Sequence, residues 1–173
     1  MPRMARLFVE NACNHIVARG NQKRIVFKAG CDFKRYFMLI HKYKLKYSCL
    51  IYGYCLMPNH IHLILESPLG LRAMSRFMHC VNQCYAMGFN VKYEKVGHLW
   101  QNRYKNLIVL KDNYLLNLIT YIEYNPVRAG LVSAPEEYAW SSFRSRILGE
   151  QSIILDEYGA GDSSRMNIGT VLG

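Results

Sequence analysis

Two histidines are the residues of this sequence whose types and spacing point most directly to chemistry. In "CLMPNHIHLIL", residues 55–65, His60 and His62 are separated by one isoleucine. On an extended strand, side chains two residues apart point to the same side with Cα atoms about 6.6 Å apart, so the two imidazoles can converge on one cation. An isolated pair of this kind is more often exposed or hydrogen-bonded. A metal site needs a third ligand from another element, because neither an HExxH motif nor a closely following histidine accompanies the pair.

A tyrosine and an asparagine later in the chain are candidates to complete such a site. Tyr121 and Asn125 are four residues apart, so on a helix they lie one turn apart on the same side. The apolar residues of this helix share a neighbouring face: Leu115, Leu118, Ile119 and Ile122. The pattern presents a phenol and a carboxamide at the margin of a buried surface, where an active site could sit. Taken alone, Tyr121 is more typical of an amphipathic residue at the edge of a core.

Hydrophobic patterns and turn signals predict the elements that would position these residues. Apolar runs predict four strands, and helical spacing predicts three helices. In chain order, these are a strand over 15–21, a helix over 32–46, strands over 49–57 and 60–66, a helix over 71–87, a strand over 98–110 and a helix over 112–125. Asp32 and Asp112 are expected to cap the first and third helices, and residues 89–97 to form a loop. The close strand spacing predicts an α+β fold, with a largely antiparallel sheet of four to five strands and helices packed on it.

Composition limits the domain organisation and the compartment. Residues 1–148 are expected to form one domain, and residues 149–173 a mobile C-terminal tail. The six cysteines are scattered, which favours reduced thiols over a zinc module or a disulfide framework. No apolar run approaches the roughly 18 residues that a membrane span needs, and the N-terminus lacks the pattern of a secretory signal. We therefore expect a cytoplasmic protein with no membrane partner.

The charge of the chain points to a polyanion as its partner. Lys and Arg number 22 against 12 Asp and Glu, a net charge of +10, and 13 tyrosines and 7 phenylalanines accompany them. Basic and aromatic side chains together suit a nucleic acid, whose phosphates bind cations and whose bases stack on rings. The candidate DNA-binding residues are Arg19, Asn21, Lys23 and Arg24 in "ARGNQKR", Trp100, Arg103 and Lys105 in "WQNRYK", and Arg128 in "NPVRAG". Each basic residue alone could be a solvated charge, Trp100 a core residue and Arg128 part of a helix cap.

Four segments together resemble a known family. "MPNHIHLIL", "GHLWQNRYK", "YIEYNPVRAGLV" and "YAWSSF" follow one another in the order found in single-tyrosine HUH transposases, in the branch of the REP-associated tyrosine transposases. The likeness runs from about "NHIVARGN" to "WSSF", some four-fifths of the chain. Tyr124 is a departure, because similar sequences commonly have an apolar residue at that position.

The resemblance implies a fold, a site and a reaction. The fold would be a ferredoxin-like HUH domain, with His60, His62 and Asn125 as ligands of a divalent metal, Mg²⁺ or Mn²⁺, and with Tyr121 as the nucleophile. The reaction would be a transesterification of single-stranded DNA that leaves a 5′-phosphotyrosine link and a free 3′-hydroxyl, so that joining needs no ATP. The partner would be DNA with hairpin elements. Similar proteins include monomers and homodimers.

Other functions remain open from the sequence. The chain could be a domesticated, non-catalytic DNA-binding protein of the same fold, or a replication or mobilisation nuclease of the wider HUH group. A metal-dependent hydrolase without a covalent step is also compatible with the histidine pair. The substitution Tyr121→Phe separates that last alternative, because hydrolysis would survive it and covalent joining would not.

Overall fold

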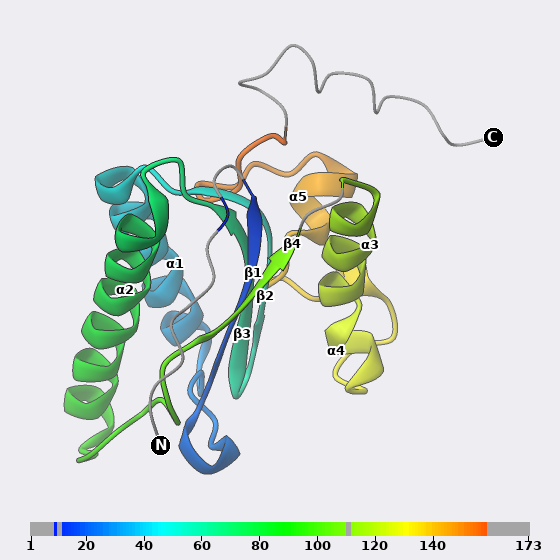
Figure 1. Cartoon of the computed structure of the whole chain (residues 1–173). Coiled ribbons are helices and arrows are strands. Elements are labelled where there is room, and N and C mark those ends of the chain that lie inside the picture. Colours follow the sequence, from blue (N-terminus) through cyan, green and yellow to red (C-terminus); the bar gives the residue numbers. More distant parts are fainter. Residues whose placement is uncertain (1–8, 10–11, 110–111, 159–173) are drawn as a thin grey trace.

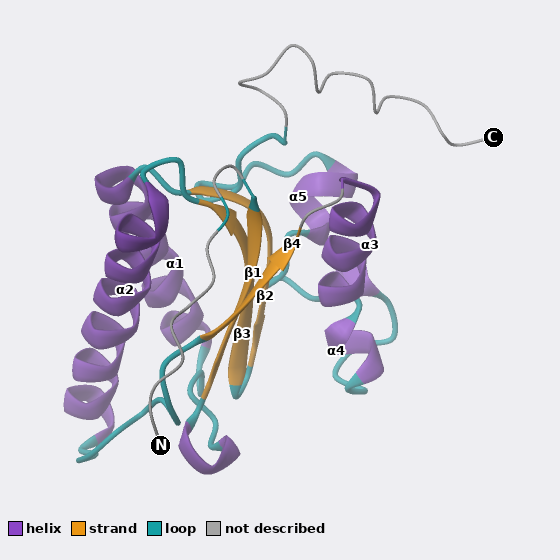
Figure 2. Ribbon diagram, in the orientation of Figure 1, coloured by secondary structure: helices purple, strands orange, loops and turns teal. Residues whose placement is uncertain are grey.

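The computed structural model describes residues 9, 12–109 and 112–158, and within them the chain forms an antiparallel sheet of four strands with helices on both faces (Figures 1 and 2). The strands are β1 (Cys13–Arg19), β2 (Leu50–Met57), β3 (His60–Glu66) and β4 (Lys105–Val109), in the spatial order β2-β3-β1-β4. The helices are α1 (Gly30–Tyr47), α2 (Gly70–Tyr93), α3 (Asp112–Glu123), α4 (Asn125–Arg128) and α5 (Phe143–Leu148). The order β1-α1-β2-β3-α2-β4 is that of a ferredoxin-like domain. The predicted α+β fold is confirmed.

The alternation of side chains along β3 divides the core into two layers. Ile61, Leu63 and Leu65 face α1 and α2, and Ile64 packs with Ile119 on the face covered by α3. Figure 1 shows α1 and α2 on one side of the sheet and α3, α4 and α5 on the other. His60 and His62 have the same parity as Ile64, so the sheet directs both of them to the α3 side.

The helix boundaries differ from the predicted ones where tertiary contacts decide them. Helix α2 continues to Tyr93, through the segment predicted as a loop, because Phe89 is buried in the core and Gly88 leaves room for the guanidinium group of Arg35. Helix α1 begins at Gly30, two residues before the predicted cap Asp32. The Asp32 carboxylate still closes the helix start, since it accepts hydrogen bonds from the backbone N–H groups of Lys28 and Ala29.

The prediction of a strand over 98–110 was wrong for its first part, because residues 98–104 do not form a strand. They run as an irregular segment before β4, joined to the end of β1 by an isolated bridge between Gly20 and Trp100. Helix α3 ends at Glu123, and the short helix α4 follows from Asn125 with Pro126 in its first turn, where proline lacks only a hydrogen bond that the helix would not make.

The packed body also extends beyond the predicted boundary at residue 148. Ile154 is fully buried, and the buried ammonium of Lys44 donates to its carbonyl (2.9 Å) and to the Asp156 carboxylate (2.6 Å). The Asp156 carboxylate in turn accepts the backbone N–H of Ile51 at the start of β2 (2.7 Å). Residues 150–158 are therefore held against the sheet by an ion pair that composition alone does not reveal. The rest of the predicted tail, residues 159–173, lies outside the described residues.

Candidate active site

The histidine pair lies at the start of β3, a central strand between β2 and β1. The rings of His60 and His62 have their centroids 4.9 Å apart and are inclined by 80°. Burial, with the nearby charge of Arg19, lowers the pKa of His60 to about 4. Burial, with His60, His15, Arg19 and Arg128 nearby, lowers the pKa of His62 to about 3. Both imidazoles are therefore neutral at physiological pH, which is the form that binds a metal ion.

Each histidine of the pair is also held by a neighbour that the sequence did not single out. Nδ1 of His60 lies 2.6 Å from the side-chain oxygen of Asn59, and Nδ1 of His62 lies 2.9 Å from Nε2 of His15. His15 is buried on β1, where it is paired with Ile64 in the register between the two strands. Burial lowers the pKa of His15 as well. Only the β1–β3 register, which local sequence does not give, brings His15 to the pair.

Tyr121 lies near the end of α3 with its side chain 53% exposed. The guanidinium carbon of Arg128 lies 4.0 Å from the centroid of its ring, and the same guanidinium donates to the backbone carbonyl of Tyr121 and to the side-chain oxygen of Asn125 (3.1 Å). Tyr124, the second phenol of this segment, instead packs edge-on against Phe143 of α5. Of the two phenols, Tyr121 therefore has the guanidinium cation of Arg128 against its ring, whereas Tyr124 has an aromatic neighbour.

The end of α3 is fixed by a buried ion pair. The carboxylate of Glu123 is fully buried, and it accepts hydrogen bonds from the hydroxyl of Ser142 (2.6 Å) and from Nε and Nη2 of Arg146 (3.1 and 2.6 Å). These partners belong to "WSSFRSR", residues 140–146, so the segment resembling the family's "WSSF" holds the helix that carries Tyr121. Two of the four family-like segments therefore position the tyrosine.

Asn125 meets the expectation of a polar group one turn after Tyr121, and among the described residues its side chain is hydrogen-bonded to Arg128 and not to the histidines. Its oxygen accepts from Arg128, and its buried nitrogen has no hydrogen-bond partner in the described part of the chain. An unsatisfied buried amide is unfavourable by about 1–3 kcal/mol, as expected of a group whose bonding a ligand completes. The role of Asn125 as third ligand stays a prediction.

The donor set suits a divalent cation with open coordination positions. In the residues that the structure describes, no group of three or more His, Cys, Asp or Glu side chains comes together as a metal site. Any cation at His60 and His62 would therefore take its remaining ligands from an amide, from water or from a phosphate. Oxygen ligands favour Mg²⁺ or Mn²⁺, whereas imidazoles also bind Zn²⁺ and other late metals, so the identity of the cation stays a prediction.

The two predicted DNA-binding segments lie side by side. Backbone N–H groups of Asn21 and Gln101 donate to the carbonyls of Leu99 (2.8 Å) and Arg19 (2.9 Å), respectively. Gly20 is needed at this junction, because a side chain there would collide with the backbone of Arg24. The basic residues of the two segments, which we call the basic edge, are all exposed: Arg19, Lys23, Arg24, Arg103 and Lys105. Arg19 connects the basic edge to the site, since it is paired with His60 in the sheet.

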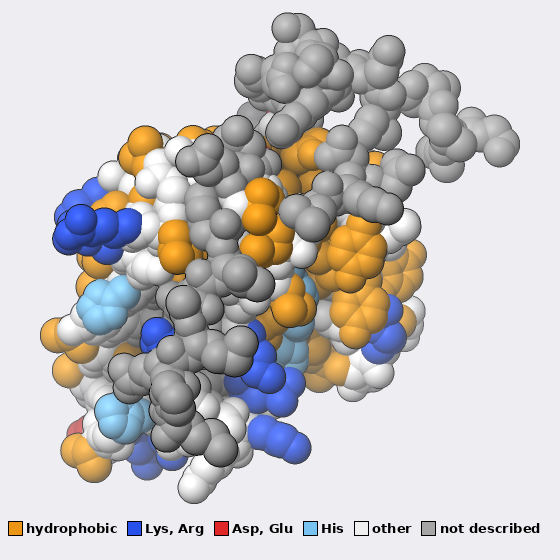
Figure 3. All heavy atoms as spheres, in the orientation of Figure 1, with side chains coloured by type: hydrophobic (Ala, Val, Ile, Leu, Met, Phe, Trp, Pro, Cys, Tyr) orange, Lys and Arg blue, Asp and Glu red, His pale blue; other side chains and the backbone are white. Residues whose placement is uncertain are grey.

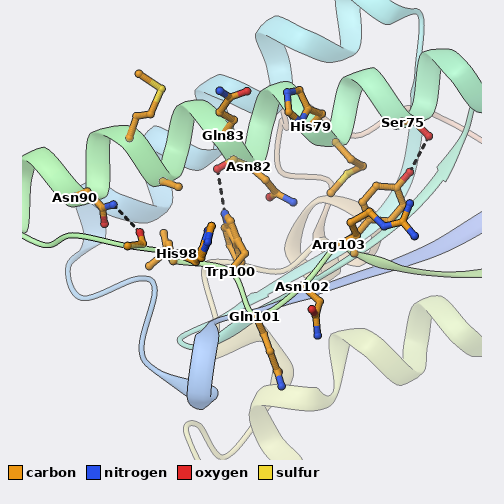
Figure 4. A pocket seen from close by; sticks show the side chains of 16 residues that line it. Ser75, His79, Asn82, Gln83, Asn90, His98, Trp100, Gln101, Asn102 and Arg103 are labelled. Atoms are coloured by element: carbon orange, nitrogen blue, oxygen red, sulfur yellow. Dashed lines mark hydrogen bonds between the residues drawn. The ribbon is translucent and has the colours of Figure 1, made fainter. Parts of the chain in front are cut away.

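Trp100 is half-buried, and the structure gives its ring contacts with the core. Its indole N–H donates to the backbone carbonyl of Asn82 on α2 (3.0 Å; Figure 4). Its ring packs against Tyr36 and Tyr85. It also lines a pocket of about 810 Å³ between α2 and residues 97–104, which the sequence did not indicate. Carboxamides and histidines are frequent in this lining: His79, Asn82, Gln83, Asn90, His98 and Asn102.

The surface around the site is rich in positive charge. Figure 3 shows Lys and Arg side chains gathered beside a histidine near the lower centre of this face, next to an apolar area over α3, with very little acidic surface in view. A surface with this charge attracts phosphate groups. None of the described helices is both long enough and apolar enough to span a membrane.

Comparisons with known proteins agree with this architecture. A candidate REP-associated tyrosine transposase of Haemophilus influenzae is 26% identical over 105 residues, which cover 56% of this chain and 60% of that relative. The chain therefore aligns with about three-fifths of the relative's length. A solved structure of a REP-associated tyrosine transposase bound to a REP hairpin superimposes with a TM-score of 0.71 at 19% identity, over 91% of this chain and 92% of that one, and shows a shared fold.

The resemblance to REP-associated tyrosine transposases expected from the sequence is confirmed by these relatives. The family described as IS200-like transposases matches residues 8–125, well over half of the 173 residues. The chain belongs to the IS200-like transposase family.

Proposed function

We propose that this protein is a metal-dependent transesterase that nicks and joins single-stranded DNA carrying hairpin elements, through a covalent bond between Tyr121 and a 5′-phosphate. The observation that carries the proposal is the combination of a neutral histidine pair on β3 with a tyrosine whose ring is covered by a fixed arginine cation. A protein that only bound DNA would need neither group. The hairpin is suggested by the structural relative, which is bound to a REP hairpin.

The tyrosine supplies the nucleophile. The phenol oxygen of Tyr121 attacks the phosphorus of a phosphodiester, the new O–P bond replaces the bond to the 3′-oxygen, and that oxygen leaves and takes up a proton as a 3′-hydroxyl. The phenol proton is lost to solvent as the oxygen attacks. Because one phosphoester replaces another, a 3′-hydroxyl can attack the phosphotyrosine and restore the DNA without ATP.

Arg128 places a fixed cation beside Tyr121. Its guanidinium is held in place by hydrogen bonds to the carbonyl of Tyr121 and to the side chain of Asn125, so the cation does not need to be ordered during the reaction. A fixed positive charge at this position would stabilise the negative charge of an approaching phosphate and of the transition state.

The histidines complete the site by binding a cation. Mg²⁺ or Mn²⁺ held by His60, His62 and Asn125 would act as a Lewis acid toward the phosphate oxygens and the leaving oxygen. The protein's part is to keep both imidazoles neutral and half-buried, so that protons do not compete for them near pH 7.

The basic edge and the pocket beside it supply the DNA-binding surface. Exposed Arg and Lys side chains of the basic edge bind phosphates on both sides of the site. The pocket along α2 offers amides such as Asn82 and Gln83 for base edges, with Trp100 in its wall, and has the size to take unpaired bases. We therefore assign Trp100 to the wall of the pocket for unpaired bases, and the basic edge to contacts with the phosphate backbone of the DNA.

The test is covalent capture. The protein is incubated with Mn²⁺ and a 3′-labelled oligonucleotide that contains a hairpin with single-stranded flanks, because a 5′-phosphotyrosine bond keeps the 3′ part of the cut strand on the protein. Adducts are separated under denaturing conditions. We expect a labelled adduct with the wild type, and its loss in Tyr121→Phe. Tyr124→Phe is the matched control, because it removes a phenol of similar exposure, 39% against 53%, three residues later at the corner between α3 and α4.

Two outcomes would contradict the proposal. If no hairpin oligonucleotide, including those drawn from the flanks of its own gene, forms an adduct, then the chain acts as a binding protein. If DNA is cut at the wild-type rate by Tyr121→Phe, then the reaction is hydrolysis by a metal-bound water and not transesterification.

A further inference from the structure

The side chain of Asn59 fixes the tautomer of His60. Its amide nitrogen donates to the backbone carbonyl of Lys23 (3.3 Å), and its oxygen lies 2.6 Å from Nδ1 of His60. A backbone carbonyl only accepts hydrogen bonds, so the amide nitrogen must face Lys23 and the amide oxygen must face the histidine. An oxygen acceptor at that distance requires a proton on Nδ1. Neutral His60 therefore has its free lone pair on Nε2.

The same nitrogen of His62 is engaged by His15. Nδ1 of His62 lies 2.9 Å from Nε2 of His15, with ring centroids 5.1 Å apart and ring planes inclined by only 21°. Between two neutral imidazoles, one of these nitrogens carries the proton and the other accepts it. If His15 were the donor, then His62 would have Nδ1 occupied and its own proton on Nε2, with no lone pair for a cation. Metal binding by His62 therefore requires that His62 donates and His15 accepts.

We propose that Asn59 and His15 are positioning residues that each accept the Nδ1–H of one histidine, and so leave Nε2 of both His60 and His62 as the two lone pairs offered to one divalent cation. The proposal rests on the metal site of the proposed function and names the residues that orient it. Partners of this kind hold the ring of a metal-binding histidine and raise the basicity of its free nitrogen.

Both acceptors are themselves fixed by the fold. His15 is buried on β1, diagonal to His62 across the β1–β3 pair, so its ring has little freedom to turn away. Asn59 and Pro58 also hold the turn over residues 20–26, which carries Lys23 and Arg24 of the basic edge. The backbone carbonyl of Asn59 accepts from the N–H of Gly20 (2.8 Å), and that of Pro58 accepts from the N–H of Val26 (2.8 Å). The hydrogen bond from Asn59 to Lys23 therefore joins the turn that we assign to DNA to the orientation of a metal ligand.

The tautomers are tested directly by nuclear magnetic resonance. Long-range ¹H–¹⁵N correlation spectra of the metal-free, full-length protein at pH 7.5 distinguish protonated from unprotonated ring nitrogens, and the signals are assigned with His60→Gln and His62→Gln. We expect a protonated Nδ1 and a free Nε2 in both histidines. A proton on Nε2 of either one would overturn the proposal, whether or not the protein joins DNA.

Metal affinity supplies the second test. His15→Phe keeps a buried ring but removes the nitrogen acceptor. Asn59→Leu keeps a side chain of similar size but removes the oxygen acceptor. Each substitution should weaken Mn²⁺ binding about 10- to 100-fold in calorimetry. Asn59→Asp, which keeps an oxygen acceptor, should bind within a few fold of the wild type. His41→Phe, a substitution on α1 outside the metal site and the pocket along α2, is the matched histidine control and should leave the affinity unchanged.

Two further results separate the possible failures. With Zn²⁺ as a diamagnetic probe, a large shift of Nε2 of His15 on metal addition would make His15 a ligand and overturn its positioning role. Unchanged Mn²⁺ affinity in both His15→Phe and Asn59→Leu, with wild-type unfolding transitions, would overturn it as well. A wild type with the expected tautomers and affinities but no covalent adduct would instead contradict the proposed function alone.

Discussion

The guanidinium of Arg128 lies over the ring of Tyr121, with its central carbon 4.0 Å from the ring centroid. The two residues come from adjacent helices, and the corner between α3 and α4 brings them together. Arg128 also contributes to the lowered pKa of His62, behind burial and the nearer histidines, which places its charge within electrostatic reach of the histidine pair. The positive charge of Arg128 therefore acts on both the proposed nucleophile and the proposed metal site.

Arg128→Ala should slow adduct formation more than it weakens DNA binding. Loss of a fixed charge over the ring of the proposed nucleophile should remove about 1.5–3 kcal/mol of stabilisation of the charge that develops on the phosphate, which is roughly a 10- to 100-fold lower rate. Arg128→Lys should recover only part of it, because an ammonium cannot cover the ring and donate to Tyr121 and Asn125 at once. Single-turnover rates at saturating DNA measure this effect. A wild-type rate in Arg128→Ala would remove Arg128 from the reaction.

Metal binding should be almost independent of pH between about 7.5 and 5.5. The lowered pKa values of about 4 for His60 and about 3 for His62 mean that both imidazoles stay neutral over this range, and protons compete only below it. Two histidines with an ordinary pKa near 6.5 would lose about 100-fold in affinity over the same range. Calorimetric titration with Mn²⁺ in a buffer that does not bind metals makes the comparison. A loss near 100-fold would mean that the pair is solvated like surface histidines.

The ion pair behind α3 should contribute measurably to folding. Among the described residues, Arg146→Ala leaves the fully buried carboxylate of Glu123 with Ser142 as its remaining hydrogen-bond partner, so we expect the free energy of unfolding to fall by about 2 kcal/mol. Arg144→Ala is the matched control, because its pair with Glu150 is exposed and is worth roughly 0–1 kcal/mol. Urea unfolding followed by circular dichroism gives both values. Equal losses in the two variants would contradict the proposed role of the Glu123 ion pair.

Local sequence was enough to predict β1, β2, β3, the histidine pair and the helix of Tyr121, because alternation and helical spacing act over a few residues. It placed the start of β4 seven residues too early. It was not enough to predict the partners of those residues. His15 and His62 are 47 residues apart and meet only through the register of β1 and β3. The length of α2 depended on Gly88 accommodating Arg35 from another helix. Arg128 was recognised as basic, but its position over Tyr121 depends on the corner between two helices.

Binding of DNA should depend on salt through the basic edge. Removing one side chain that neutralises a phosphate should reduce the slope of log K against log salt by about 0.7–0.9. Lys23→Ala and Arg24→Ala should each show this reduction with a hairpin oligonucleotide, and the pair together roughly twice as much, since both side chains are exposed and separate from the core. Lys42→Ala is the control, because Lys42 is equally exposed but lies on α1, over the ring of Tyr43. Fluorescence anisotropy between 50 and 300 mM salt, roughly the range where such slopes are resolved, measures the effect. An equal change in Lys42→Ala would show that the charge of the whole surface, and not the basic edge, holds the DNA.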